Sequence, residues 1–254
     1  MITIKSEREL AKMRVACRVV GELLAEIEGW VRPGVSTQEL DQKAEAFIRS
    51  KGAEPAFKGY RGFPATICAS VNEEVVHGIP NARKLKEGDL FTADVGAKYQ
   101  SYYGDAARTF AVGKVTKQAQ DLMKTTREAL DAALAQVGPG ARLSQIARAV
   151  QQLAEGRGYG VVRKYVGHGI GSALHEDPQV PNYVSRDLLE NDVTLEPGMV
   201  LALEPMLNCG THDVELLDDG WTVVTADRKL SAHFEDTVAV TREGREILTR
   251  LEWK

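Results

Sequence analysis

The same order of motifs occurs twice along this chain of 254 residues. Four pairs of segments match: VRPG at 31–34 with VGPG at 137–140, HGI at 77–79 with HGI at 168–170, 88–94 with 198–204, and 105–112 with 235–240. Two copies about 110 residues apart indicate a duplicated half-domain rather than a solenoid. We therefore expect one domain spanning 1–254, built from related halves at about 1–115 and 116–254. Facing halves would bring residues that are distant in sequence to one interface, where ligand sites prefer to form.

Each half begins with the pattern of two amphipathic helices. Apolar residues recur at three- and four-residue steps over 7–28 and again over 117–137, which places them on one helix face. A Pro-Gly break follows each helix, and second helices are expected over 36–50 and 144–156. The first of these opens with Ser36-Thr37-Gln38-Glu39, which has the form of a capping box. Strand-like runs follow both helix pairs, so the sequence predicts an α+β fold.

Four acids and one histidine lie in or beside apolar, β-prone runs. They are Asp94, Asp105, His168, Glu204 and Glu235. A charged side chain is costly in such a place unless it is paired or bound to a metal. The repeat assigns two of the acids to each half, so facing halves would gather all four. Such a set has the composition of a two-metal hydrolytic site, in which paired ions activate water.

Each of these residues also has a simpler interpretation. Asp94 and Asp105 could be solvated acids near a hairpin, and Glu204 or Glu235 could be a core glutamate paired with an arginine. His168, between two glycines, could satisfy a core hydrogen bond. The metal site is favoured because all five residues occur together.

The donor atoms narrow the choice of metal. Structural zinc sites prefer clustered Cys and His ligands, and this chain has no such cluster. Four carboxylates with one imidazole suit Mn²⁺, Fe²⁺ or Co²⁺, and Zn²⁺ remains open. Two divalent ions per chain are therefore expected, with their identity left undetermined.

Two further histidines are candidates for acid–base catalysis. His77 in VVHGIP and His175 in ALHEDPQVP could donate to a scissile carbonyl or accept from an amide, although solvent-exposed loop histidines are an equal alternative. The sequence assigns no role to His212 or His233.

Composition and charge limit the binding partners and the cellular compartment to be expected. The net charge of −4 does not favour a nucleic-acid-binding surface, and no nucleic-acid motif occurs. Three cysteines without a CxxC pair indicate a reducing compartment. No apolar run approaches the ~18 residues of a membrane span, and the charged N-terminus lacks a signal region. We expect a cytoplasmic protein without membrane contact, acting as a monomer.

The ordered set of Asp94, Asp105, GHGIG with His168, EPM with Glu204 and FED with Glu235 closely resembles the methionine aminopeptidases. The resemblance covers nearly the whole chain and is nearest to the short form of the type I class. It implies the pita-bread fold, with two pseudo-symmetric halves and an antiparallel sheet covered by helix pairs. It also implies removal of the initiator methionine from nascent polypeptides, preferring a small second residue, with transient ribosome contact.

The resemblance further implies a role for each site residue. Asp105 and Glu235 would bridge two ions, Asp94 would complete one, and His168 with Glu204 the other. Glu204 would accept a proton from water, and His77 and His175 would orient the scissile peptide. A methionine pocket would be lined by Tyr60, Phe63, Cys68 and Trp221.

Two rival interpretations remain, and a few positions depart from the family pattern. Proline-specific aminopeptidases and prolidases carry the same five ligands, typically with an extra N-terminal domain. A catalytically dead relative acting as an interaction module would be expected to lose ligands, and all five are present. His233 stands where glutamine is common and Asp236 follows Glu235, so both could tune metal affinity, and Cys209 is unusual.

Overall fold

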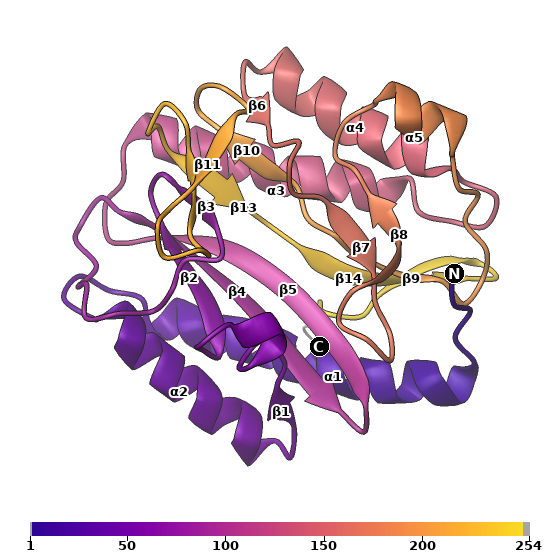
Figure 1. The fold of residues 1–254 in the computed structure, drawn as a ribbon, viewed down its shortest axis with the longest axis horizontal. Helices are drawn as coiled ribbons and strands as arrows, with labels where there is room; N and C mark the ends of the chain where they lie inside the picture. The colour runs from indigo at the N-terminus through magenta and orange to yellow at the C-terminus, as the bar shows by residue number, and fades with distance from the viewer. Residues whose placement is uncertain (1, 251–254) are drawn as a thin grey trace.

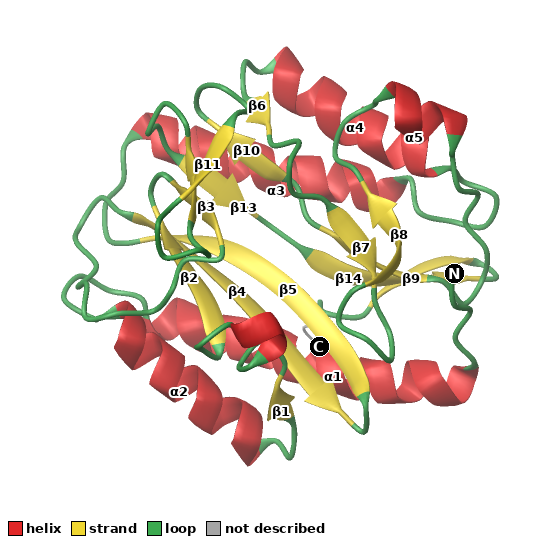
Figure 2. Cartoon of the chain, viewed as in Figure 1, coloured by secondary structure: helices red, strands yellow, loops and turns green. Residues whose placement is uncertain are grey.

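Two helix pairs lie on opposite sides of a set of strands in the computed structural model, which describes residues 2–250 (Figures 1 and 2). One pair is α1 (Glu7–Trp30) and α2 (Thr37–Ser50), and the other is α3 (Lys117–Ala135) and α4 (Leu143–Gly156). The helices expected from periodicity are therefore found, with ends shifted by two residues or fewer. The short helix α5 (Arg186–Glu190) and the single 3₁₀ turn η1 (Tyr60–Gly62) lie in connecting segments.

Side-chain caps explain where the first two helices begin. Before α1, the Glu9 carboxylate accepts a hydrogen bond from the backbone N–H of Ser6 at 2.8 Å. Before α2, the Ser36 hydroxyl accepts from the backbone N–H of Glu39 at 3.1 Å. These bonds satisfy amide groups that have no partner within the first turn of a helix.

The strands form antiparallel sheets. In one, β4 (Leu90–Tyr99) pairs with β1 (Glu54–Pro55), β2 (Ile67–Val71) and β5 (Tyr102–Ala111). A second has the order β15 (Gly244–Ile247), β14 (Asp236–Thr241), β9 (Val200–Leu203), β7 (Gly167–Gly169), β8 (Glu176–Val180). Two three-stranded sheets have the orders β13 (Ser231–His233), β10 (Met206–Asn208), β6 (Gly160–Val161) and β11 (Val214–Leu216), β12 (Val223–Thr225), β3 (Glu74–Val76).

Strands β5 and β14 bring the two larger sheets into contact. Ala107 in β5 and Glu235, just before β14, exchange two backbone hydrogen bonds, at 2.9 and 3.4 Å. Two residues further along, the Thr237 hydroxyl donates to the backbone oxygen of Asp105 at 2.7 Å. This junction joins segments about 130 residues apart in sequence and lies between the helix pairs (Figure 1).

Apolar packing fixes each helix pair to its own strands. One core cluster packs α1 and α2 against β2 and β4, and another packs α3 and α4 against β9, β13 and β14. Fully buried side chains such as Leu23, Phe91, Leu122 and Leu201 each contribute about 1.5–3 kcal/mol. The strands between the helix pairs are thereby held as rigid supports. None of the helices within residues 2–250 is long and apolar enough to cross a membrane.

Candidate metal centre

The β4–β5 hairpin holds Asp94 and Asp105 on one face. Asp94 lies opposite Ala107, and Asp105 lies opposite Gly96. Because side chains alternate between the faces of a strand, these four positions project to the same side. The two carboxylates therefore meet diagonally across the hairpin, as the sequence led us to expect.

The second large sheet supplies the other three residues. His168 in β7 lies opposite Ala202 in β9, Glu204 directly follows β9, and Glu235 directly precedes β14. The junction between β5 and β14 then places Glu235 beside Asp105. All five residues predicted as metal ligands line one cavity of about 140 Å³.

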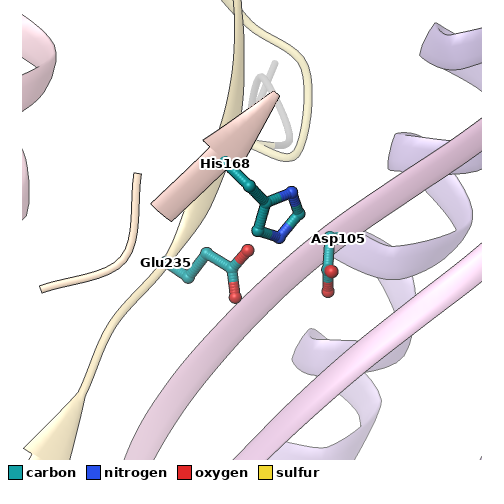
Figure 3. A group of neighbouring side chains, drawn as sticks. All are labelled: Asp105, His168 and Glu235. Carbon is teal, nitrogen blue, oxygen red and sulfur yellow. The ribbon is translucent and has the colours of Figure 1, made fainter. Parts of the chain in front are cut away.

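Three of these side chains converge tightly (Figure 3). One potential ligand atom from each of Asp105, His168 and Glu235 lies within 4.8 Å of the others. The Nε2 atom of His168 is also 3.7 Å from Oε1 of Glu204. The group thus has the spacing of side chains that share a cation.

The carboxylates in this cavity lack the partners that buried anions need. Asp105 and Glu235 are only 4% and 2% exposed. Within residues 2–250, Oδ1 of Asp94, Oδ1 of Asp105 and Oε1 of Glu235 are buried without a hydrogen-bond partner. Unpaired buried charges are strongly unfavourable, so the donor set fits bound divalent cations.

The same crowding raises the pKa values of these acids. Burial raises the pKa of Asp105, Glu204 and Glu235 well above the usual range, and neighbouring carboxylates raise each pKa further. Burial also raises the pKa of Asp94. A divalent cation would reverse this by stabilising the ionised forms.

His168 is oriented to offer one ring nitrogen to the centre. Its Nδ1 lies 2.8 Å from the backbone oxygen of Gly169, so that nitrogen carries the proton and Nε2 presents its lone pair. Burial lowers the pKa of the ring, which favours the neutral form. Gly169 itself is required because an added Cβ would lie 2.1 Å from the backbone oxygen of Asp177.

The two other predicted histidines lie at the same cavity. The His175 ring stacks on Tyr60, and its Nδ1 is 2.9 Å from the tyrosine hydroxyl. His77 adopts a left-handed backbone conformation with φ of 60°, and its ring meets Trp221 edge-on. Burial lowers the pKa of both histidines, and the neighbouring His168 ring lowers the pKa of His175 further. The left-handed backbone of His77 is strained for a residue other than glycine, and such strain is typical of functional sites.

The predicted pocket residues Tyr60, Phe63, Cys68 and Trp221 also line this cavity. Phe63 and Trp221 pack edge to face, with ring centroids 5.1 Å apart. The structure adds three lining residues that the sequence did not single out: Phe57, Arg61 and Leu174. Leu174 directly precedes His175, but the segment around Phe57 and Arg61 carries no periodic signal that could have indicated a pocket.

The sequence also did not indicate a buried network of ion pairs next to the candidate metal centre. Arg108 donates to the backbone oxygen of Glu235 and, at 2.5 Å, to Oδ1 of Asp236. Arg250 donates to Oδ2 of Asp236 at 2.8 Å. Asp236 has no exposed surface. The network holds the backbone on both sides of Glu235, and its arginines lie too far along the chain to be matched from sequence.

A larger hollow of about 1,090 Å³ lies between α1, β5 and α3. It contains none of the five predicted ligands and neither of the predicted substrate histidines. The smaller cavity is therefore the better candidate site, because the unpaired buried carboxylates converge there.

Comparison with known proteins agrees with this geometry. The profile of metallopeptidase family M24 matches residues 11–242. Methionine aminopeptidase 1 of Bacillus subtilis is 50% identical over 251 residues, covering 99% of this chain and 100% of the relative. The crystal structure of methionine aminopeptidase from Thermotoga maritima superposes with a TM-score of 0.95 at 43% identity, covering 99% of this chain and 100% of that one.

A more distant structure shares the fold alone. Prolidase from Pyrococcus furiosus has a TM-score of 0.80 at 24% identity, and the match covers 98% of this chain but 66% of the prolidase. The predicted α+β, pita-bread fold is confirmed by these neighbours.

Proposed function

The chain belongs to metallopeptidase family M24, and from that premise we propose that it removes the initiator methionine from nascent polypeptides by metal-dependent hydrolysis. The observation that carries the proposal is the convergence of Asp94, Asp105, His168, Glu204 and Glu235 on one cavity. The full-length similarity to methionine aminopeptidases supports this substrate over a proline-containing one.

Two divalent ions, of Co, Mn, Fe or Zn, would be held by these five residues. The resemblance to the methionine aminopeptidases implies that Asp105 and Glu235 would be shared between both ions. Asp94 would complete one site, and His168 with Glu204 the other. When bound, such a pair lowers the pKa of water and polarises the scissile carbonyl.

The chain's own residues would position the substrate and move the proton. Glu204 would accept the proton from the attacking water, because its carboxylate lines the cavity beside the proposed ligand His168. His77 and His175 would donate to the carbonyl oxygen or hold the peptide in place. Tyr60 would keep the His175 ring in position through the 2.9 Å contact with Nδ1.

The methionine side chain would occupy the apolar end of the cavity. Phe63 and Trp221 supply aromatic surface there, and Tyr60 and Cys68 complete the lining. Thioethers make favourable contacts with aromatic rings. The limited volume of about 140 Å³ supports a preference for a small second residue.

The proposal extends to the organisation and setting of the protein. The chain would act as one catalytic domain, 1–254, with halves at about 1–115 and 116–254. Each half would contribute one helix pair and two carboxylates. It would work as a cytoplasmic monomer that meets nascent chains during transient ribosome contact.

Peptide cleavage tests the function directly. Metal-free protein reconstituted with each candidate ion should release methionine from Met-Ala-Ser and leave an Ala-Pro peptide intact. Cleavage of the Ala-Pro peptide alone would instead favour the proline-specific relatives. No cleavage together with metal stoichiometry near zero would favour a non-catalytic module.

Point variants test the residue roles. Glu204→Gln and His168→Ala should abolish turnover while leaving the unfolding temperature of the metal-free protein largely unchanged. His212→Ala is the matched control, because this side chain is 41% exposed and absent from the cavity lining. Retained activity in Glu204→Gln or His168→Ala would contradict the assignment.

A further inference from the structure

Within residues 2–250, one buried histidine beside the candidate metal centre lacks a hydrogen-bond partner for its ring. His233, at the end of β13, is 1% exposed. Neither of its ring nitrogens has a hydrogen-bond partner within residues 2–250. An unsatisfied buried polar group costs about 1–3 kcal/mol, so this arrangement calls for a physical explanation.

The ring faces two of the proposed ligands. Its Nε2 atom is 3.8 Å from Oε2 of Glu235 and 3.9 Å from Oε2 of Glu204. The other oxygen of Glu204, Oε1, faces Nε2 of His168 at 3.7 Å. Thus one oxygen of Glu204 faces the proposed ligand His168, and the other faces His233.

The backbone around His233 is fixed. Its N–H donates to the Thr109 hydroxyl at 2.9 Å, and that hydroxyl lies 2.9 Å from the His233 backbone oxygen. In β10, Met206 lies directly opposite His233. The backbone of His233 is therefore held in place, and rotation of the glutamate side chains would cover the ~1 Å that separates these contacts from hydrogen bonds.

We propose that His233 is a positioning residue of the metal centre, whose Nε2–H holds the carboxylates of Glu204 and Glu235 in the orientation that binds cations. The inference rests on the proposed metal-dependent function. A neutral imidazole carries one N–H, and the tautomer with the proton on Nε2 is favoured because two carboxylates face Nε2 whereas Nδ1 has no partner within residues 2–250. Donors of this kind orient ligating carboxylates, and their loss typically weakens metal binding 10–100-fold.

A matched pair of substitutions at His233 tests whether metal binding depends on the N–H donor or only on the size of the side chain. Gln and Met have similar length, but only Gln carries N–H donors. Calorimetric titration of the metal-free full-length protein with Mn²⁺ should show a Kd within a few-fold of wild type for His233→Gln. For His233→Met, the Kd should rise about 10–100-fold. The exposed His212→Met is the control and should bind as wild type does.

The outcomes are distinguishable. If wild type binds no Mn²⁺ or other candidate ion, the proposed function itself fails. Wild-type affinity in His233→Met, or equal weakening in His233→Gln and His233→Met, overturns the positioning role. Should His233→Met not fold, His233→Leu provides the same comparison, and failure of both to fold without metal also overturns the inference, because the ring would then be needed for the fold.

Discussion

Replacing Asp236 by Asn should destabilise the protein strongly without changing any proposed metal ligand. Oδ1 of Asp236 accepts from Arg108 at 2.5 Å and from the Thr249 hydroxyl at 2.8 Å, while Oδ2 accepts from Arg250 at 2.8 Å. Both oxygens of this carboxylate therefore accept hydrogen bonds from buried or part-buried donors. An asparagine amide has similar size, but it would point an NH₂ group at one of these donors.

The ion pairs of Asp236 determine how much stability the substitution should remove. Removing one partner of a buried ion pair typically costs 3–5 kcal/mol, because the other charge stays buried. Two features place the cost at about the lower end of that range. Arg250 is 35% exposed and keeps Asp131, and Arg108 keeps its bonds to backbone oxygens. We expect a loss of about 3 kcal/mol, or roughly 6–12 °C in Tm for a chain of this size.

Urea unfolding of the metal-free protein, followed by circular dichroism, measures this loss. Glu190→Gln is the control, because Arg186 and Glu190 form a pair whose side chains are 92% and 57% exposed. Such a pair should contribute less than about 0.5 kcal/mol. A loss below about 1 kcal/mol in Asp236→Asn would contradict this expectation, because neutral hydrogen bonds could then replace the buried ion network.

Three other changes have outcomes set by the structure. Burial raises the pKa of Glu176, but hydrogen bonds from Lys5 and Thr3 outweigh it and lower the pKa to about 2 from 4.5. The stability that this ionised group contributes is present above pH 4.5 and lost as the pH falls towards 2. Because solvent partly screens this group, wild type should lose about 1–3 kcal/mol more than Glu176→Gln between pH 6 and pH 2 in urea titrations. Gly169→Ala should unfold at lower temperature and bind Mn²⁺ weakly because its Cβ would meet the backbone oxygen of Asp177, whereas Gly29→Ala, with open space around it, should gain about 0.5–1 kcal/mol; equal melting temperatures would contradict this. In a thiol assay of the native protein, half-buried Cys209 should react well before buried Cys17 and Cys68, and fast reaction of either buried thiol would contradict their burial.

The local parts of the fold could be read from the sequence. Periodicity located α1 to α4 within two residues, because each helix buries one apolar stripe against the strands beneath it. The four acids and one imidazole stood out because charge in an apolar run is expensive. Their gathering at one cavity follows from the pairing of β4 with β5 and of β7 with β9.

The supporting contacts could not be read in the same way. Arg108 and Arg250 are ordinary surface-type residues until the fold brings both to Asp236. Phe57 and Leu174 line the cavity through loop conformations that no periodicity encodes. The position of His233 between two glutamates depends on the register of β13 with β10.

The helices, the strand-prone runs and the types of side chain available for chemistry follow from the amino-acid sequence, because they depend on local pattern and composition. The folded structure is needed to show which oxygen atoms are left without a partner, which histidine nitrogen faces the candidate metal centre, and which charges support Glu235. These depend on distances between segments more than 100 residues apart, such as Asp105 and Thr237, and on the water that their packing excludes. Local sequence encodes neither quantity.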